Sequence, residues 1–295
     1  MEKKENIREL VTDMVTEIVA GREKSHILIR NVLDKYAYLP GYNRNFIKKV
    51  TEGTLERLVT IDYVLNSFSK VPVNKMKPFI RSLMRMSVYQ ILYLDKVPDS
   101  AACNEAVKLA QKRGFGPLKG FVNGVLRNAV RTYGQLKAPT GWENIYSHPQ
   151  KLIDLLIGYV GKEKMESMLR ANNEIPPTVV QVNTLRTTTQ QLKQQLQEQG
   201  VTAEMHSWME NCLVLSGTGN LEQLDGFRQG LFYVQDAAAK LSVLCAGITP
   251  GQRVLDCCAA PGGKSFAAAI AMGDTGSITS CDIHPHKLKL IESGA

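Results

Sequence analysis

The sequence has few of the residues that build metal centres and disulfide frameworks, and those present lack the required spacing. Its 295 residues include six cysteines and five histidines, and no two cysteines form a Cys-x-x-Cys pair. Zinc sites and disulfide-stapled folds depend on such regular spacings. We therefore expect no bound metal, and we predict that the cysteines are reduced thiols.

Long apolar segments are also absent. The opening residues Met-Glu-Lys-Lys-Glu-Asn contain no apolar signal core, and no uncharged apolar run approaches the roughly eighteen residues that cross a bilayer. Neither export nor membrane insertion is indicated, so we expect a cytoplasmic protein, and we expect it to be monomeric. A hydrophobic content of 44% over this length predicts about two domains.

Positive charge is concentrated in the first half of the chain. The formal net charge is +8, but residues 1–140 hold 24 Lys and Arg against 13 Asp and Glu, whereas the remainder holds 12 against 15. Between Lys70 and Lys137 there are thirteen basic residues and three acidic ones. Such clustering is typical of proteins that bind RNA or DNA, although a solvated helical surface is the alternative.

The first half is predicted to be helical and the middle of the chain to be mixed. Apolar residues recur at helical spacing from residue 6 to 132, with one helix ending at Gly21 and others beginning near Ser25, Asn45, Pro78, Ser100 and Pro117. Lys137 to Gly141 break this pattern and mark a linker. Beyond it, helices are expected over 152–159, 162–172 and 189–199, and strands over 178–183, 201–206 and 212–215.

The most informative segment lies near the end of the sequence. Val254 to Lys264 is typical of a buried strand, a glycine turn and a helix start, and 277–282 of a second strand that ends in Asp282. Asp282 lies twenty residues beyond Gly262, a separation that suits a carboxylate bonded to both hydroxyls of a ribose. An adenosine-containing cofactor is therefore favoured.

Spacing argues against two phosphate-binding alternatives. Gly263-Lys264-Ser265 matches the end of a P-loop, but the first glycine of that motif would fall on Cys258. The dinucleotide pattern Gly-x-Gly-x-x-Gly also fails, because Gly262 and Gly263 are adjacent and follow Pro261.

The segment Asp-Cys-Cys-Ala-Ala-Pro-Gly-Gly-Lys closely resembles the S-adenosylmethionine loop of the Sun/Fmu group of RNA (cytosine-5) methyltransferases. The resemblance implies that Asp282 holds the cofactor's ribose. It also implies that the loop wraps the methionine and adenosine parts through Cys258, Ala259, Ala260, Pro261, Gly262, Gly263 and Lys264. We expect Cys257 and Cys258 to be small buried residues at the strand end rather than reactive thiols.

Two further segments carry related resemblances. Residues 85–94, 104–107 and 121–127 resemble the all-helical NusB-type RNA-binding domain, which implies phosphate contacts by Lys108, Lys112, Arg113, Lys119, Arg127 and Arg131. Residues 147–149, 177–185 and 233–236 resemble the pre-catalytic region of the same methylases. This second match departs from the family at Lys151, near the place of an aromatic residue, and at Gln181, which replaces an arginine.

These segments predict a multidomain fold of three parts. They are an all-α NusB-like domain over 1–138, a small α+β connecting domain over 142–230, and, over 231–295, the start of an α/β Rossmann-like methyltransferase domain. The family resemblance implies S-adenosylmethionine-dependent methylation of C5 of a cytosine in 16S ribosomal RNA. The alternatives are a non-enzymatic NusB-like RNA-binding or antitermination factor, and a cytosine-5 methylase acting on another RNA.

No catalytic residue is assigned from the sequence. Methylation at cytosine C5 requires a thiolate that adds to C6. In the family this cysteine lies in a Thr-Gln-Cys-Ser-like motif, and a product-releasing cysteine lies in an Asp-Ala-Pro-Cys-like motif. Neither motif occurs in residues 1–295. We therefore expect the nucleophile to lie beyond Ala295 and the 295-residue chain alone to be inactive.

Overall fold

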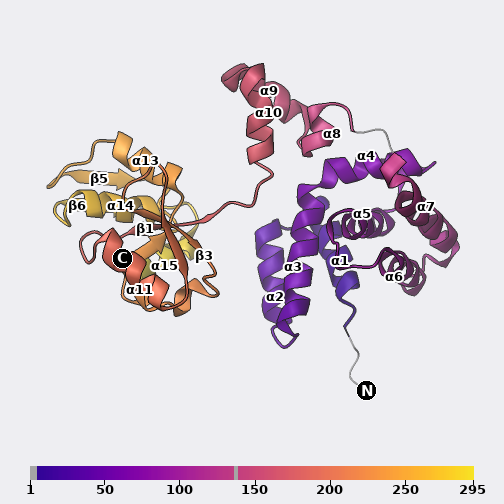
Figure 1. Ribbon diagram of the computed structural model, residues 1–295, viewed down its shortest axis with the longest axis horizontal. Coiled ribbons are helices and arrows are strands. Elements are labelled where there is room, and N and C mark those ends of the chain that lie inside the picture. Colours follow the sequence, from indigo (N-terminus) through magenta and orange to yellow (C-terminus); the bar gives the residue numbers. More distant parts are fainter. Residues whose placement is uncertain (1–4, 136–138) are drawn as a thin grey trace. The chain divides into compact units, whose positions relative to one another are not determined.

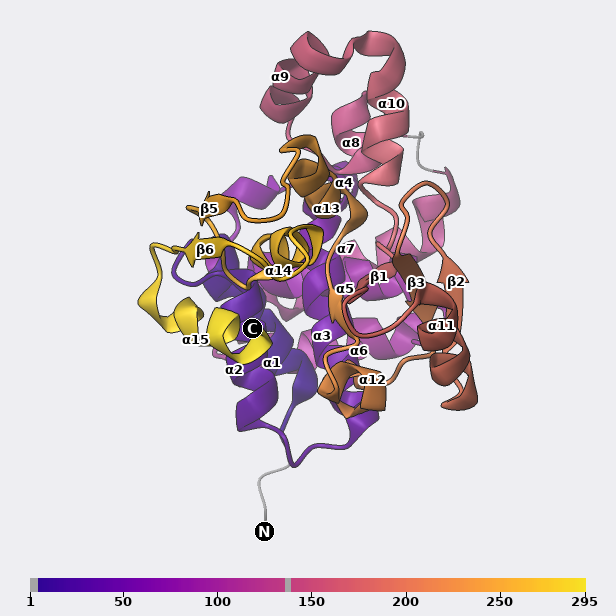
Figure 2. The same cartoon turned by 90° about the vertical axis from the view of Figure 1, so that its left-hand side faces the viewer.

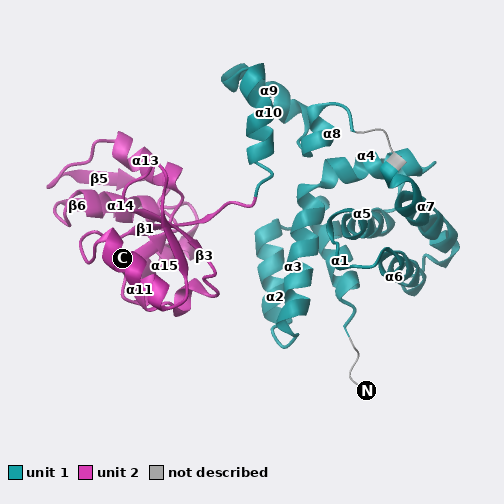
Figure 3. Ribbon diagram, in the orientation of Figure 1, with its two compact units in different colours: residues 1–174 teal, residues 175–295 magenta. Residues whose placement is uncertain are grey.

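The computed structural model describes residues 5–135 and 139–295. They form two compact units, residues 1–174 and residues 175–295 (Figure 1, Figure 3). Among the described residues, no helix combines the length and the apolar character needed to cross a membrane.

The regular elements described in the first unit are all helices. Its long helices confirm the predicted pattern: α1 (Ile7–Val19), α2 (Ser25–Lys35), α3 (Gly41–Glu56), α4 (Leu58–Phe68), α5 (Pro78–Tyr93), α6 (Asp99–Lys112) and α7 (Lys119–Thr132). The Asn6 side chain caps α1 by accepting a hydrogen bond from the Glu9 N–H, and Gly21 follows the helix with φ +70°. The single helix expected from Asn45 is instead two, α3 and α4, which meet at Arg57.

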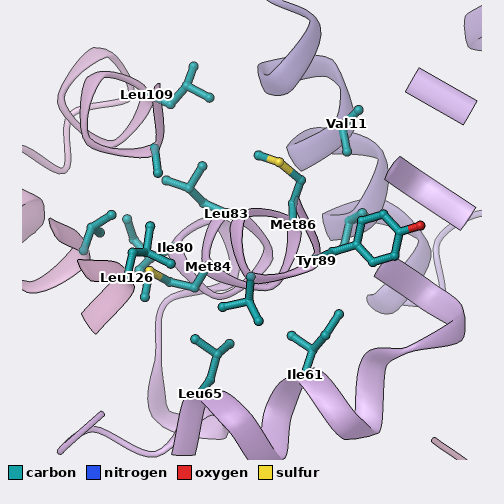
Figure 4. Close-up of a cluster of buried hydrophobic side chains, with 14 of the residues drawn as sticks. Val11, Ile61, Leu65, Ile80, Leu83, Met84, Met86, Tyr89, Leu109 and Leu126 are labelled. Carbon is teal, nitrogen blue, oxygen red and sulfur yellow. The ribbon is translucent and has the colours of Figure 1, made fainter. Parts of the chain in front are cut away.

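Helix α5 lies at the centre of this unit. Figure 4 shows its side chains Ile80, Leu83, Met84 and Met86 among residues of the surrounding helices, including Ile61 and Leu65 of α4. The break between α3 and α4 allows α4 to pack these two residues on α5. Both oxygens of Asp62 accept hydrogen bonds from Arg85, at 2.7 and 2.6 Å, which neutralises a cation buried in α5.

Gly53 of α3 is required by its contact with Tyr89 of α5. A Cβ added at this position would lie 2.1 Å from the Tyr89 ring. We expect Gly53→Ala to reduce the free energy of unfolding by about 1–3 kcal/mol, because the ring is packed in the core and must shift. Urea denaturation of the protein measures this change.

Gly120 of α7 provides a matched control for this substitution. A Cβ there meets nothing within 4 Å, so Gly120→Ala is expected to gain roughly 0.5–1 kcal/mol of helix stability. If both substitutions stabilise the protein, the proposed clash with Tyr89 is wrong.

Three further helices belong to the first compact unit: α8 (Trp142–Tyr146), α9 (Gln150–Val160) and α10 (Lys162–Ala171). Helix α8 is joined to α4, since the Thr60 hydroxyl donates to the Asn144 carbonyl at 2.7 Å and the Val59 N–H donates to the Ser147 hydroxyl at 3.2 Å. The predicted linker, 137–141, lies partly outside the described residues. The domain boundary near residue 140 stays a prediction, and the two compact units divide after Glu174.

The second unit begins with a four-stranded antiparallel sheet. Its order is β2 (Thr202–Met205), β3 (Cys212–Ser216), β1 (Thr178–Val182) and β4 (Phe232–Val234). Helix α11 (Thr189–Glu198) begins with a capping box formed by Thr188 and Gln191, and it lies against β2 and β3 (Figure 2). The short α12 (Asp225–Arg228) precedes β4. The core between α11 and the sheet includes Val180, Leu192, Leu196, Leu213 and Phe232.

Strand β4 was not predicted. It pairs with β1, with Val180 opposite Val234, so it belongs to the sheet of the connecting region although it lies after residue 230. Hydrogen bonding to a strand fifty residues earlier determines its place, and local sequence carries no signal for that pairing.

The last part of the unit is a strand, a helix and a parallel strand, as predicted. Strands β5 (Arg253–Asp256) and β6 (Ser277–Ser280) pair with Asp256 opposite Ser280, and α14 (Gly263–Ala271) connects them. Helix α13 (Ala237–Cys245) packs on α14, and α15 (Pro285–Gly294) follows β6. The observed fold is thus all-helical, then α+β, then α/β, and it confirms the predicted fold class.

Candidate cofactor and RNA sites

The loop between β5 and α14 is fixed by hydrogen bonds to both strands of the parallel pair. Asp256, the last residue of β5, accepts bonds from the Cys258 N–H at 3.2 Å and from the Ser265 hydroxyl at 2.9 Å. The Ala259 N–H donates to the Cys281 carbonyl at 2.9 Å. The backbone of the predicted cofactor loop is therefore braced by hydrogen bonds within the chain itself.

Both loop glycines occupy positions where a side chain would interfere. Gly262 has φ +117°, and a Cβ there would lie 2.2 Å from the Phe266 ring. A Cβ on Gly263, the first residue of α14, would lie 3.2 Å from the Gln235 amide nitrogen. The predicted glycine turn is confirmed. In this structure the space beside Gly262 is occupied by the Phe266 ring of α14, the helix that Gly262 precedes.

Asp282 lies beside this loop, as the motif spacing predicted. Its carboxylate accepts bonds from the backbone N–H of His284 at 3.0 Å and from that of Ala260 at 3.3 Å. The bond from His284 is the main cause that lowers the pKa of Asp282 below its ordinary value, and the bond from Ala260 and the charge of Lys287 add to it. The carboxylate is therefore ionised at neutral pH and is positioned as a hydrogen-bond acceptor.

The expectation that Cys257 and Cys258 are buried is wrong. Both are exposed, as are Cys281 and Cys245, whereas Cys103 and Cys212 are buried. Among the described residues β5 pairs only with β6, so side chains at its end face solvent, and Leu255 in the same strand is 63% exposed.

A buried amide that the sequence did not single out lies at the start of α14. Gln235 is 7% exposed, and neither its amide nitrogen nor its amide oxygen has a hydrogen-bond partner among the described residues. Native structures rarely leave such groups unpartnered. The residues around the loop therefore fit a polar ligand: an uncapped helix start, an ionised carboxylate and a buried amide without a partner.

The six basic residues predicted to contact RNA fall into two groups. Lys112 pairs with Glu9 of α1, and Arg113 pairs with Asp13 at 2.9 Å and with Glu9 at 3.2 Å. Burial alone would raise the pKa of Glu9, but the bonds from Lys112 and Arg113 lower it overall. These two cations therefore join α6 to α1 and are largely neutralised.

The other four cations line a groove between α6 and α7, which we call the α6–α7 groove. Of these four, Lys108 also pairs with Glu105 of its own helix at 2.8 Å, and Asp99 is an acidic residue of the lining. One part, of about 520 Å³, includes Arg127 and Arg131, and the adjoining part, of about 460 Å³, includes Lys108 and Lys119. Asn123 lines both parts and also accepts a bond from Arg127 at 2.9 Å. A basic groove of this kind can follow a phosphate backbone.

Two family models match the chain. The NusB family model matches residues 5–131, and a second model, described as Methyltr_RsmF/B-like, ferredoxin-like domain, matches residues 148–222. The first match covers α1 to α7. The second runs from α9 through the first three strands of the antiparallel sheet.

Curated relatives match nearly the whole chain. It is 32% identical over 298 residues to the probable ribosomal RNA small subunit methyltransferase B of Bacillus subtilis (strain 168), covering 99% of this chain and 66% of the relative. The corresponding Synechocystis protein is 33% identical, covering 96% and 64%. The chain thus spans about two thirds of the length of these relatives.

A solved structure supports the fold alone. The crystal structure of PH0851 has a TM-score of 0.70 at 20% identity and covers 100% of this chain and 67% of that chain. The two domain matches and the curated relatives confirm the predicted family: the chain belongs to the Sun/Fmu family of RNA methyltransferases.

Proposed function

We propose that this chain binds S-adenosylmethionine and serves the methylation of C5 of a cytosine in 16S ribosomal RNA; no residue of 1–295 is assigned the role of the nucleophile. The observation that carries the cofactor part of the proposal is the position of Asp282, whose ionised carboxylate lies against the Ala260 N–H. A ribose placed over this loop would donate its hydroxyl hydrogens to that carboxylate. The relatives are named as ribosomal RNA methyltransferases, which favours RNA as the substrate.

In this proposal each group of residues has a defined task. Asp282 orients the ribose, and the N–H groups at the start of α14 face the amino acid end of the cofactor. When bound, S-adenosylmethionine supplies a methyl group on a sulfonium. The loop backbone, fixed by Asp256 and Cys281, keeps these groups in place without reorganisation.

The α6–α7 groove is proposed to bind phosphates of the RNA. Its cations Lys108, Lys119, Arg127 and Arg131 carry the interaction, although Lys108 pairs with Glu105, because its side chain is still 73% exposed. Lys112 and Arg113 contribute less because they pair with Glu9 and Asp13 of α1. Phosphate contacts position an RNA without reading its sequence. Selection of one cytosine must therefore come from other parts of the protein.

A change at Asp282 tests the cofactor site. Calorimetric titration of the protein with S-adenosylhomocysteine should show affinity reduced about 5- to 150-fold in Asp282→Ala, because the ribose loses its acceptor. Glu292→Ala, which removes an exposed carboxylate from α15, serves as the control and should bind like the unsubstituted protein.

The titrations distinguish the role of Asp282 from the cofactor site as a whole, and the enzyme from the alternative RNA-binding factor. Unchanged affinity in Asp282→Ala would show that the carboxylate does not hold the ribose. If the unsubstituted protein binds no S-adenosylhomocysteine but does bind 16S ribosomal RNA, the alternative of a non-enzymatic RNA-binding factor is favoured, in line with the NusB match over residues 5–131.

A further inference from the structure

Gln235 occupies the connection between the two sheets of the second unit. It follows β4 directly and precedes Asp236, which caps α13 by accepting a bond from the Ala238 N–H at 2.8 Å. Its backbone is fully used: the N–H donates to the Val179 carbonyl, and its carbonyl accepts from the Gln181 side chain, both at 3.2 Å. The side-chain direction of Gln235 is thus set by the antiparallel sheet.

The Gln235 side chain, in contrast, makes no hydrogen bond to the described residues. It is 93% buried, being 7% exposed, and both polar atoms of the amide lack partners among the described residues. Burying an amide without hydrogen bonds opposes folding, and an apolar side chain of the same size would avoid that penalty. The described residues therefore leave both amide atoms without a partner, although the amide could satisfy a polar ligand.

The amide lies beside the start of α14. Its nitrogen is 3.2 Å from the place that a Cβ on Gly263 would occupy, and Gly263 is the first residue of α14. The preceding Gly262 offers no side chain to cap the helix. An uncapped helix start and an unpartnered amide thus adjoin each other, while Asp282 is bonded to Ala260, three residues earlier in the loop.

We propose that Gln235 binds the amino acid end of S-adenosylmethionine, an inference that rests on the proposed function. A primary amide presents an NH₂ group, which donates, and a carbonyl oxygen, which accepts, side by side. The amino acid end is the part of the cofactor that carries an anion next to a cation. The Gln235 amide nitrogen donates to its carboxylate, and the amide oxygen accepts from its ammonium group.

Two ligands distinguish this role from a structural one. S-adenosylhomocysteine has the amino acid end, whereas 5′-methylthioadenosine has the same adenosine and thioether without it. In Gln235→Leu, calorimetry should show affinity for S-adenosylhomocysteine reduced about 10- to 100-fold, since hydrogen bonds to charged groups are lost. Affinity for methylthioadenosine should change less than about twofold, because it never contacted the amide.

Stability provides a second readout. The melting temperature of the ligand-free protein should rise in Gln235→Leu, since an unpartnered amide is removed. Gln181→Leu is the matched contrast, because that buried amide accepts from Cys212 at 2.7 Å and donates to the Gln235 carbonyl, so its loss should lower the melting temperature. Gln235→Glu, which keeps the size, should also weaken S-adenosylhomocysteine selectively, by repulsion of its carboxylate.

Two other outcomes would overturn either the assignment of Gln235 or the proposed function. Equal losses for both ligands, or unchanged affinity for S-adenosylhomocysteine, would overturn the assignment of Gln235 while leaving the cofactor site standing. Binding of neither ligand by the unsubstituted protein would overturn the proposed function and this inference with it.

Discussion

The substitution Gly262→Ala is expected to reduce the affinity for S-adenosylhomocysteine by more than about 100-fold and to lower the free energy of unfolding by roughly 1–3 kcal/mol. Gly262 has φ +117°, which residues with a Cβ rarely adopt, and the added carbon would lie 2.2 Å from the Phe266 ring. Relief of both conflicts requires movement of the backbone that Ala259 and Asp256 hold. Calorimetric titration and urea denaturation of the same preparation measure the two effects.

Two variants distinguish the cost of the positive φ at position 262 from the cost of the clash with the Phe266 ring. Gly273, which follows α14, has φ +60° and open space around it, so Gly273→Ala should show only the backbone penalty, with cofactor affinity unchanged. Adding Phe266→Ala to Gly262→Ala should restore part of the lost stability if the ring is the obstacle. Full affinity in Gly262→Ala would show that the loop does not contact the cofactor.

Removal of the four cations of the α6–α7 groove should weaken RNA binding by about 100- to 1000-fold at low salt. We expect the unsubstituted protein to show a slope of log K against log salt near −3.5 to −4.5, as for about five neutralised phosphates. Replacing Lys108, Lys119, Arg127 and Arg131 by alanine should remove about three to four units of that slope. Fluorescence anisotropy with a labelled fragment of 16S ribosomal RNA at several salt concentrations measures both quantities.

A pairwise comparison tests the division between the two groups of cations. Arg127→Ala with Arg131→Ala removes the same formal charge as Lys112→Ala with Arg113→Ala. The first pair should reduce the slope by about two and the second by less than one, because Glu9 and Asp13 already neutralise the second pair. Equal effects of the two pairs would show that the whole basic surface acts without a preferred groove.

The local elements of this protein could be predicted from its sequence because their signals are local. The spacing of Ile7, Leu10, Val11 and Met14 encodes α1, and the glycine pair between two apolar runs encodes the turn before α14. The approach of Asp282 to the loop was also foreseeable, since the ends of neighbouring parallel strands meet at one edge of a sheet.

What the sequence did not reveal depends on residues far apart along the chain. The pairing of β4 with β1, the packing of α8 on α4 and the bonds from Arg113 to α1 each join segments separated by many residues. Exposure of Cys257 and Cys258 likewise depends on which strands flank β5. The role proposed for Gln235 could not be inferred from its residue type, because only the packing shows that its amide has no partner.

The short connection after β4 has a mechanical consequence for the second unit. A single residue, Gln235, separates a strand of the antiparallel sheet from the capping residue of α13, and α13 packs on α14. A hinge at this point would pull the Gln235 amide away from Gly263. The antiparallel sheet and the cofactor loop are therefore expected to move as one rigid body. A displacement of the sheet would then also displace the loop.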